Sequence, residues 1–270
     1  MTILFFGDVV GKAGREAIKR MLPAIRAEHS PDLVCANVEN LAHGKGITLH
    51  TLNFMIAAGV DFFTSGNHVF DKPEGKQVFE EHGDKIVRPA NLKDDLPGKG
   101  WKIIEVNGVA VLIVNLLGKV FMEKQFDQGE IGNPFLKLNE ILNEVGDKAK
   151  VKILDFHAEA TSEKRGMGFW ADGRVSAVFG THTHVLTADA QILPQGTGYA
   201  TDIGMAGVYD SIIGVQKEAA LNRFAAGGDN SIKMPLTVAE EGACEASYLV
   251  VEIDEATGKC ENISSFRKIS

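Results

Sequence analysis

The sequence predicts an α/β fold with mainly parallel strands in its first third and antiparallel strands further along. In that first third, short apolar runs are each followed by a polar loop and then by a stretch with apolar residues at helical spacing. Repetition of this unit is typical of parallel strands joined by helices. Asn107-Gly108 lies between two β-rich runs and predicts a tight hairpin. Mixed sheets flanked by helices are therefore expected.

The first three units each contain a strand, a loop and a helix. The expected strand and helix ranges are, in chain order, 3–6 and 11–29, 33–36 and 49–58, and 62–63 and 74–82. The helix at 11–29 has the clearest pattern, because Ile18, Leu22 and Ile25 recur at helical spacing. We expect the three strands to run mainly parallel.

Later segments add hairpins and further helices. The expected elements are a hairpin at 101–117, a helix at 133–145, a strand at 151–156, a helix at 161–170, a strand at 175–179, and a terminal hairpin of 247–253 and 260–266. The sequence contains no repeat or low-complexity tract, and its most linker-like run, 227–230, is only as long as a surface loop. A single domain spanning residues 1–270 is expected.

Composition and charge exclude several classes of protein. Hydrophobic residues make up 44% and charged residues 24% of the 270 residues, which is typical of folded globular chains and excludes disordered and collagen-like ones. The 28 basic and 36 acidic residues give a formal net charge of −8. This balance argues against a broad basic face, so no extended nucleic-acid partner is expected.

The sequence gives no indication of secretion or of a membrane span. The N-terminus lacks a basic region before its apolar stretch, and Asp8 interrupts that stretch early. The longest later apolar run, 109–117, has about half of the ~20 residues that a span needs. The three cysteines, Cys35, Cys244 and Cys260, are widely separated and predict a reducing compartment. We expect a cytoplasmic protein with no membrane partner.

Polar and ionisable side chains follow five of the predicted strands. Because the carboxyl ends of strands in open α/β sheets meet at one edge, we expect these side chains to converge there. In chain order they are Asp8, Asn37, Glu39, Asn40, Asn67, His68, Asp155, His157, His182 and His184. Carboxylate, amide and imidazole ligands without thiolates suit Mn, Fe, Co, Zn or Mg. Their number indicates two ions bridged by a carboxylate, rather than one ion.

Several of these residues, taken singly, also have purely structural interpretations. An isolated histidine such as His157 is more often a core or surface residue than a ligand, and only the combination of motifs favours a metal site. Asp155 and Asp202 either accept the second N–H of a ligating imidazole or simply form a turn. The glycine-rich loop 43–46 either contacts the substrate or only turns the chain.

The order of these motifs resembles that of the calcineurin-like metallophosphoesterases: Gly-Asp, an acidic residue followed by Asn, Gly-Asn-His, a single His, and Gly-x-His-x-His. Two positions depart from the usual family pattern, because Val10 stands where a histidine is common and Glu39-Asn40 replaces Gly-Asp. In these departures the chain is similar to the bacterial YmdB-type cyclic-nucleotide phosphodiesterases. The runs that carry this second resemblance are ILFFGDVVGKAGR, ENLAHGKGI, TSGNHVFD, DFHAEATSEK, GTHTHV and TDIGMAGVYDSIIG. The resemblance implies a metallophosphoesterase-type sandwich of mixed β-sheets flanked by helices.

The resemblance also implies two metal ions and their ligands. The first ion would be held by Asp8, Glu39, Asn40 and His184, and the second by Glu39, Asn67, His157 and His182. Glu39 would then bridge the two ions, and Asn40 would supply the ligand that the missing first-motif histidine gives elsewhere. Iron or manganese is the expected metal, and Zn, Co or Mg is compatible with the same ligands.

The predicted activity is hydrolysis of small phosphodiesters, with 2′,3′- or 3′,5′-cyclic nucleotides as the expected substrates. Two cations would produce a bridging hydroxide near neutral pH and neutralise the phosphate oxygens that it attacks. His68 follows the ligand Asn67 and is expected to protonate the leaving alkoxide as general acid. The expected partner is a small phosphodiester substrate, and the resemblance also implies a homo-oligomer.

The sequence alone leaves other functions open. The same site would also serve a phosphomonoesterase or a nuclease, or would hold metal in a regulatory protein with little turnover. His68 argues against the regulatory alternative, since a structural metal site needs no acid beside its ligands. A dinucleotide-binding module is disfavoured, because the glycines near Asp8 lack the GxGxxG spacing.

Overall fold

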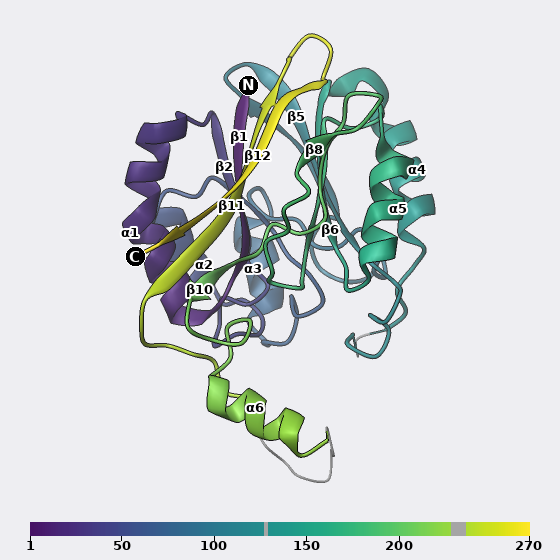
Figure 1. Ribbon diagram of the computed structural model, residues 1–270. Coiled ribbons are helices and arrows are strands. Elements are labelled where there is room, and N and C mark those ends of the chain that lie inside the picture. The colour runs from purple at the N-terminus through teal and green to yellow at the C-terminus, as the bar shows by residue number, and fades with distance from the viewer. Residues whose placement is uncertain (127–128, 228–235) are drawn as a thin grey trace.

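Two six-stranded β-sheets packed face to face form the centre of the protein, which a computed structural model describes over residues 1–126, 129–227 and 236–270 (Figure 1). In pairing order, the first sheet is β12 (Cys260–Ile269), β11 (Cys244–Ile253), β10 (Met205–Val208), β1 (Thr2–Val9), β2 (Leu33–Asn37) and β3 (Phe62–Thr64). The second sheet is β4 (Trp101–Val106), β5 (Val109–Leu117), β6 (Val151–His157), β7 (Ala177–Thr181), β9 (Gly198–Ala200) and β8 (Gln191–Ile192). Residues 228–230 of the linker-like run lie outside the described residues.

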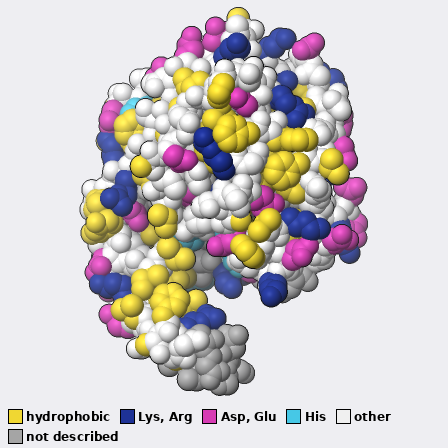
Figure 2. All heavy atoms as spheres, turned by 45° about the vertical axis from the view of Figure 1, so that its right-hand side comes forward, with side chains coloured by type: hydrophobic (Ala, Val, Ile, Leu, Met, Phe, Trp, Pro, Cys, Tyr) yellow, Lys and Arg dark blue, Asp and Glu magenta, His cyan; other side chains and the backbone are white. Residues whose placement is uncertain are grey.

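Helices cover the outer face of each sheet. The first sheet packs against α1 (Gly11–His29), α2 (Leu49–Ala57) and α3 (Gly75–His82), and the second against α4 (Pro134–Val145) and α5 (Thr161–Ala171). A 3₁₀ turn at Gly146–Lys148 follows α4, and α6 (Lys217–Ala225) projects from the body (Figure 1). Exposed apolar side chains on α6 include Leu221 and Phe224, and Figure 2 shows hydrophobic side chains gathered at that end of the molecule. In the described part of the chain, no helix is long and apolar enough to cross a membrane.

Alternation along β1 shows how the core is divided. Ile3 and Phe5 point to the second sheet, where the Phe5 ring centroid lies 4.5 Å from that of Phe179 in β7. Leu4 and Phe6 point the other way and pack against the helices of the first sheet. Successive side chains of a strand face opposite sides, so a strand covered on both faces must be apolar throughout.

Most predicted elements are confirmed. The three strand–loop–helix units are β1–α1, β2–α2 and β3–α3, and their strands pair in parallel. The predicted hairpin joins β4 to β5, with Asn107 and Gly108 at φ values of 51° and 83°, the left-handed conformation that this tight turn requires. The terminal hairpin is β11–β12. The expected fold class, mixed sheets flanked by helices, is therefore confirmed.

Four elements were not predicted from the sequence. Strands β8, β9 and β10 have two to four residues each, too few for a recognisable alternation. Helix α6 buries only Ala220, so no apolar stripe marks it in the sequence.

The ends of strands from the two sheets meet at one edge of the sandwich. Asn37, the last residue of β2, donates from Nδ2 to Asp155 Oδ2 of β6 at 3.0 Å. Thr64, the last residue of β3, donates from its hydroxyl to the same oxygen at 2.5 Å. These buried bonds join the sheets directly beneath the loops in which most of the predicted ligands lie.

Candidate metal centre

All seven side chains predicted as metal ligands lie in one hydrogen-bonded cluster at this edge. Four of them lie on or just after strands of the first sheet, and three on or just after strands of the second. In chain order, Asp8 lies in β1, Glu39 and Asn40 follow β2, Asn67 follows β3, His157 ends β6, and His182 and His184 follow β7. The convergence expected from the strand ends is therefore present in the fold.

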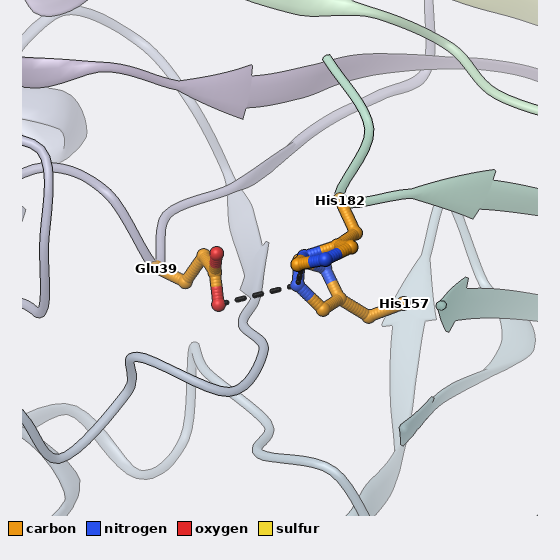
Figure 3. Close-up of side chains that lie close together, drawn as sticks. All are labelled: Glu39, His157 and His182. Atoms are coloured by element: carbon orange, nitrogen blue, oxygen red, sulfur yellow. Dashed lines mark hydrogen bonds and ion pairs between the residues drawn. The ribbon is translucent and has the colours of Figure 1, made fainter. Parts of the chain in front are cut away.

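One group of donors surrounds His157. Its Nε2 atom lies 3.3 Å from Glu39 Oε2, 3.1 Å from Asn67 Oδ1 and 3.1 Å from His182 Nδ1. Figure 3 shows Glu39, His157 and His182 pointing toward one another, and their donor atoms lie within 4.8 Å of one another, close enough to hold one metal ion. These four residues are the set predicted for the second ion.

A second group contains the remaining predicted ligands. His184 Nε2 lies 3.2 Å from Asn40 Oδ1 and 3.9 Å from Asp8 Oδ1. Asp8 also connects the two groups, because its Oδ1 lies 3.8 Å from His157 Nδ1 and its Oδ2 accepts the backbone N–H of His182 at 3.0 Å. These residues are those predicted for the first ion, apart from Glu39, whose bridging role stays a prediction.

An unpaired carboxylate oxygen of the cluster fits a cation. Asp8 is fully buried, and its Oδ1 has no hydrogen-bond partner among the described residues. A buried carboxylate oxygen without a donor is costly, and a cation would compensate it. Gly66 adds a steric reason, because a Cβ atom there would overlap Glu39 Oε2 and His157 Nε2. The backbone therefore approaches the donors as closely as a glycine permits.

Each imidazole of the cluster is held by a fixed acceptor on its far side. His182 Nε2 lies 3.0 Å from Glu159 Oε2, and His184 Nδ1 lies 2.9 Å from the carbonyl oxygen of Ile213. A carboxylate and a carbonyl only accept hydrogen bonds, so these ring nitrogens carry the hydrogens. The opposite nitrogens, His182 Nδ1 and His184 Nε2, then present lone pairs to the cluster, as metal ligands must.

His157 is oriented through a hydroxyl group. Its Nδ1 lies 2.8 Å from Thr181 Oγ1, and that hydroxyl donates to Asp155 Oδ1 at 2.7 Å. The Thr181 hydroxyl hydrogen is donated to Asp155, so the hydroxyl oxygen accepts the Nδ1–H of His157. The lone pair of His157 Nε2 then faces the cluster. Asp155, one of the two open alternatives, thus acts on the His157 imidazole through Thr181 and not directly.

The other open alternative, Asp202, contacts no imidazole. Its carboxylate accepts hydrogen bonds from Thr183, Gly204 and Lys164. The acidic partner of His182 is instead Glu159, which the sequence analysis did not single out. Its position two residues after His157, in the same motif, is the signal that could have identified it.

Burial and opposite charges shift the ionisation of the cluster. Burial raises the pKa of the Asp8 carboxyl to about 6. Burial also acts upward on Glu39, but the facing His157 outweighs it and holds the pKa of Glu39 below its usual range. Burial lowers the pKa of His157, yet Glu39 and Asp8 outweigh burial and raise that pKa to about 9. Burial and the charge of His157 lower the pKa of His182 to about 2. The cluster therefore favours a positive charge at its centre.

His68 stands beside this cluster and is tied to it. Its backbone N–H donates to Glu39 Oε2 at 3.0 Å, and its ring Nδ1 lies 2.8 Å from Asp71 Oδ2. The side chain is 20% exposed and lines the cavity above the donors. His68 is thus held where it can meet both the cluster and a bound molecule.

The cavity over the cluster has a volume of about 370 Å³. Its polar lining residues include His68, Gln125 and Glu159, and its apolar ones include Val10, Ile213, Val215 and Val238. Gly44 also lines it, whereas the side chain of His43 is 84% exposed and lies 3.6 Å from Glu240. The loop 43–46 therefore presents backbone, not the His43 ring, to this cavity.

Comparison with known proteins gives consistent matches along the whole chain. Residues 4–266 match the model of a family described as YmdB-like protein. A 2′,3′-cyclic-nucleotide 2′-phosphodiesterase of Bacillus subtilis strain 168 is 42% identical over 265 residues, covering 97% of this chain and 95% of the relative. A crystal structure of a novel phosphatase from Mycoplasma pneumoniae has a TM-score of 0.90 and 34% identity, covering 100% and 93% of the two chains. The calcineurin-like phosphoesterase YfkN of Bacillus subtilis, at 14% identity and a TM-score of 0.55 over 100% and 90%, shares the fold.

Proposed function

Since the chain belongs to the YmdB-like family, we propose that it hydrolyses small phosphodiesters, with cyclic nucleotides as its substrates. This membership confirms the resemblance predicted from the motifs. The expected class of enzyme, a phosphoesterase, is confirmed at the level of the family by relatives named as a phosphodiesterase and a phosphatase. The Bacillus relative is named for 2′,3′-cyclic nucleotides, which makes these the first substrates to test.

The observation that carries the proposal is the set of seven converging donors. We assign Asp8, Glu39, Asn40 and His184 to one ion and Glu39, Asn67, His157 and His182 to the other. Two bound divalent cations would lower the pKa of water and offset the charge of the phosphate oxygens. Imidazole, amide and carboxylate donors support iron or manganese, and the same donors accept Zn, Co or Mg.

His68 is the proposed proton donor for the leaving group. The Asp71 carboxylate accepts only, so Nδ1 of His68 carries a hydrogen toward it. The proposed acid is the other ring nitrogen, Nε2, which gives its proton to the ester oxygen that departs from phosphorus. The hydrogen bond from the His68 backbone to Glu39 keeps this acid next to the reacting phosphate.

The cavity supports a small substrate. Its volume of about 370 Å³ falls at the lower end of the range that ligand sites usually have, roughly 300–1,000 Å³. A lining of both polar and apolar residues suits a nucleotide, which has a charged phosphate, ribose hydroxyls and a flat apolar base. The net charge of −8 disfavours long nucleic acid, whose backbone binds basic surfaces.

The decisive experiment joins metal content to turnover. Protein purified without chelator should contain about two transition-metal ions per chain, the number that a binuclear site requires. It should cleave bis-p-nitrophenyl phosphate and a cyclic nucleotide with added Mn²⁺, and Asn67→Ala should lose both activities. Cleavage of p-nitrophenyl phosphate without cleavage of diesters would identify a phosphomonoesterase instead. Bound metal without cleavage of any ester would contradict the proposal and favour a regulatory protein.

A further inference from the structure

A buried ion pair outside the donor set joins helix α5 to the segment that follows β9. Lys164 Nζ lies 2.6 Å from Asp202 Oδ2, and each side chain is 1% exposed. Removing two charges from water costs about as much free energy as their attraction returns, so stability alone does not explain such a pair. The other contacts of Asp202 show what the pair holds in place.

The Asp202 carboxylate holds the residue between the two ligating histidines of the loop. Besides Lys164, Oδ2 accepts the backbone N–H of Thr183 at 3.2 Å and the Thr183 hydroxyl at 2.7 Å. Thr183 separates His182 from His184 in the chain. A displacement of Thr183 would therefore move both imidazoles.

The loop needs such a support because its backbone is strained. His182 and His184 have φ values of 94° and 64°, in the left-handed region that residues with a Cβ atom avoid. Strained backbone of this kind persists only where the surrounding structure imposes it. The two hydrogen bonds from Thr183 to the buried Asp202 carboxylate impose this backbone conformation, because Thr183 lies between the two strained residues.

The same carboxylate connects to a ligand of the first sheet. Its Oδ1 accepts the backbone N–H of Gly204 at 2.8 Å, and the Gly204 carbonyl accepts the N–H of Asp8 at 3.1 Å. Asp8 in turn accepts the backbone N–H of His182 at 3.0 Å. A closed ring of hydrogen bonds therefore links Asp202, Asp8 and the histidine loop.

The path of the lysine is also built into the fold. A Cβ atom at Gly180, in β7, would come within 2.7 Å of Lys164 Cδ and would overlap the carbonyl oxygen of Thr201. Glycine at this position therefore lets the lysine stem cross the strand just before the loop. Its ammonium group then reaches Asp202 inside the protein.

We propose that the Lys164–Asp202 pair is a positioning device that sets metal affinity by fixing the loop of His182 and His184. Neither residue contacts the cavity, so both act through Thr183 and the backbone. This inference rests on the proposed two-metal site. The pair would orient one ligand of each ion, since His182 belongs to one donor group and His184 to the other.

The test separates positioning from stability. In the double variant Lys164→Met/Asp202→Asn no buried charge is left unpaired, so its unfolding temperature should fall much less than that of Asp202→Asn alone, which leaves the buried Lys164 ammonium without its partner. Its Mn²⁺ affinity, measured by calorimetric titration of the chelator-treated full-length chain, should nevertheless fall by about tenfold or more, the range seen when groups that orient ligands are removed. Whichever way the asparagine amide is turned, its NH2 group faces a backbone N–H, that of Thr183 or that of Gly204, which needs an acceptor, so the ring of hydrogen bonds is not restored.

A matched control and a milder variant complete the test. Asp189 accepts the hydroxyls of Thr187 and Thr201 near the same loop but contacts neither histidine, so Asp189→Asn should lower stability without changing Mn²⁺ affinity. Thr183→Val keeps the ion pair and removes one bond to Asp202, and should weaken Mn²⁺ binding to a smaller extent. This variant serves if the double variant does not fold.

Three results would overturn the inference. Wild-type Mn²⁺ affinity in the double variant, or in Thr183→Val if only that variant folds, would overturn the positioning role alone. The same holds if Asp189→Asn loses as much affinity as the double variant. A wild-type chain that binds no Mn²⁺ would overturn the proposed function together with this inference, so the two failures are distinguishable.

Discussion

Glu159 and His182 form a hydrogen-bonded pair, with Glu159 Oε2 lying 3.0 Å from Nε2 of the ring while Nδ1 faces His157 at 3.1 Å. The carboxylate thus lies on the side of the ring away from the donor cluster. It determines which nitrogen carries the hydrogen and increases the basicity of the other one. Glu159 also lines the cavity, so one residue adjoins both the donor cluster and the space above it.

Replacing Glu159 by alanine should weaken metal binding. Without its acceptor, His182 is free to rotate or to adopt the other tautomer, and we expect roughly a tenfold or greater loss of Mn²⁺ affinity. Competition with a metal chelator of known affinity measures this loss. Glu123→Ala is the matched control, because Glu123 is an exposed carboxylate paired only with Lys119 among the described residues. Equal affinity in Glu159→Ala and Glu123→Ala would contradict the role of Glu159.

Replacing Thr181 by valine should lower both stability and metal content. The change removes the hydroxyl that joins His157 to Asp155 and leaves two buried polar groups short of a partner. We expect the free energy of unfolding to fall by about 1–3 kcal/mol, measured by urea denaturation. Thr181→Ser restores the hydroxyl and should recover most of this loss along with the bound metal. A serine variant as impaired as the valine variant would point to packing and not to the hydrogen bonds.

A methyl group at Gly66 should disturb the donors without unfolding the protein. The alanine Cβ would overlap Glu39 Oε2 and His157 Nε2, so both side chains must move apart. Gly66→Ala is therefore expected to bind fewer metal ions per chain by elemental analysis, with an unchanged circular dichroism spectrum. Gly166→Ala, in helix α5, is the control, since its Cβ would meet Phe135 at an ordinary 3.7 Å. Full metal content in Gly66→Ala would show that the donors lie farther apart in the metal-bound protein.

The sequence predicts the fold, and the convergence of the seven predicted ligands at one edge of it, because both depend on local patterns. Alternating and helical apolar spacing marks β1 and α1, and each predicted ligand lies at or just after a strand, where open sheets collect their functional groups. The residues that orient these side chains are different. Thr181 and Glu159 act through hydrogen bonds that depend on how neighbouring strands and loops are placed, and such contacts leave no periodic signal. The left-handed backbone of the histidine loop is likewise invisible in the sequence, because histidine rarely adopts it.

The His68–Asp71 pair makes a prediction about leaving groups. His68→Ala should keep the metal content of the wild type and lose about 10²–10⁴-fold in kcat on a cyclic nucleotide, whose leaving alkoxide needs a proton. The loss on bis-p-nitrophenyl phosphate should be much smaller, because p-nitrophenolate departs without protonation. Asp71→Asn keeps an acceptor for Nδ1 but replaces the charged acceptor with a neutral one, which holds the ring less firmly, so its loss on the cyclic nucleotide should be intermediate. Steady-state kinetics on both substrates tests this order. Equal losses on the two substrates would mean that His68 positions the phosphate instead of donating a proton.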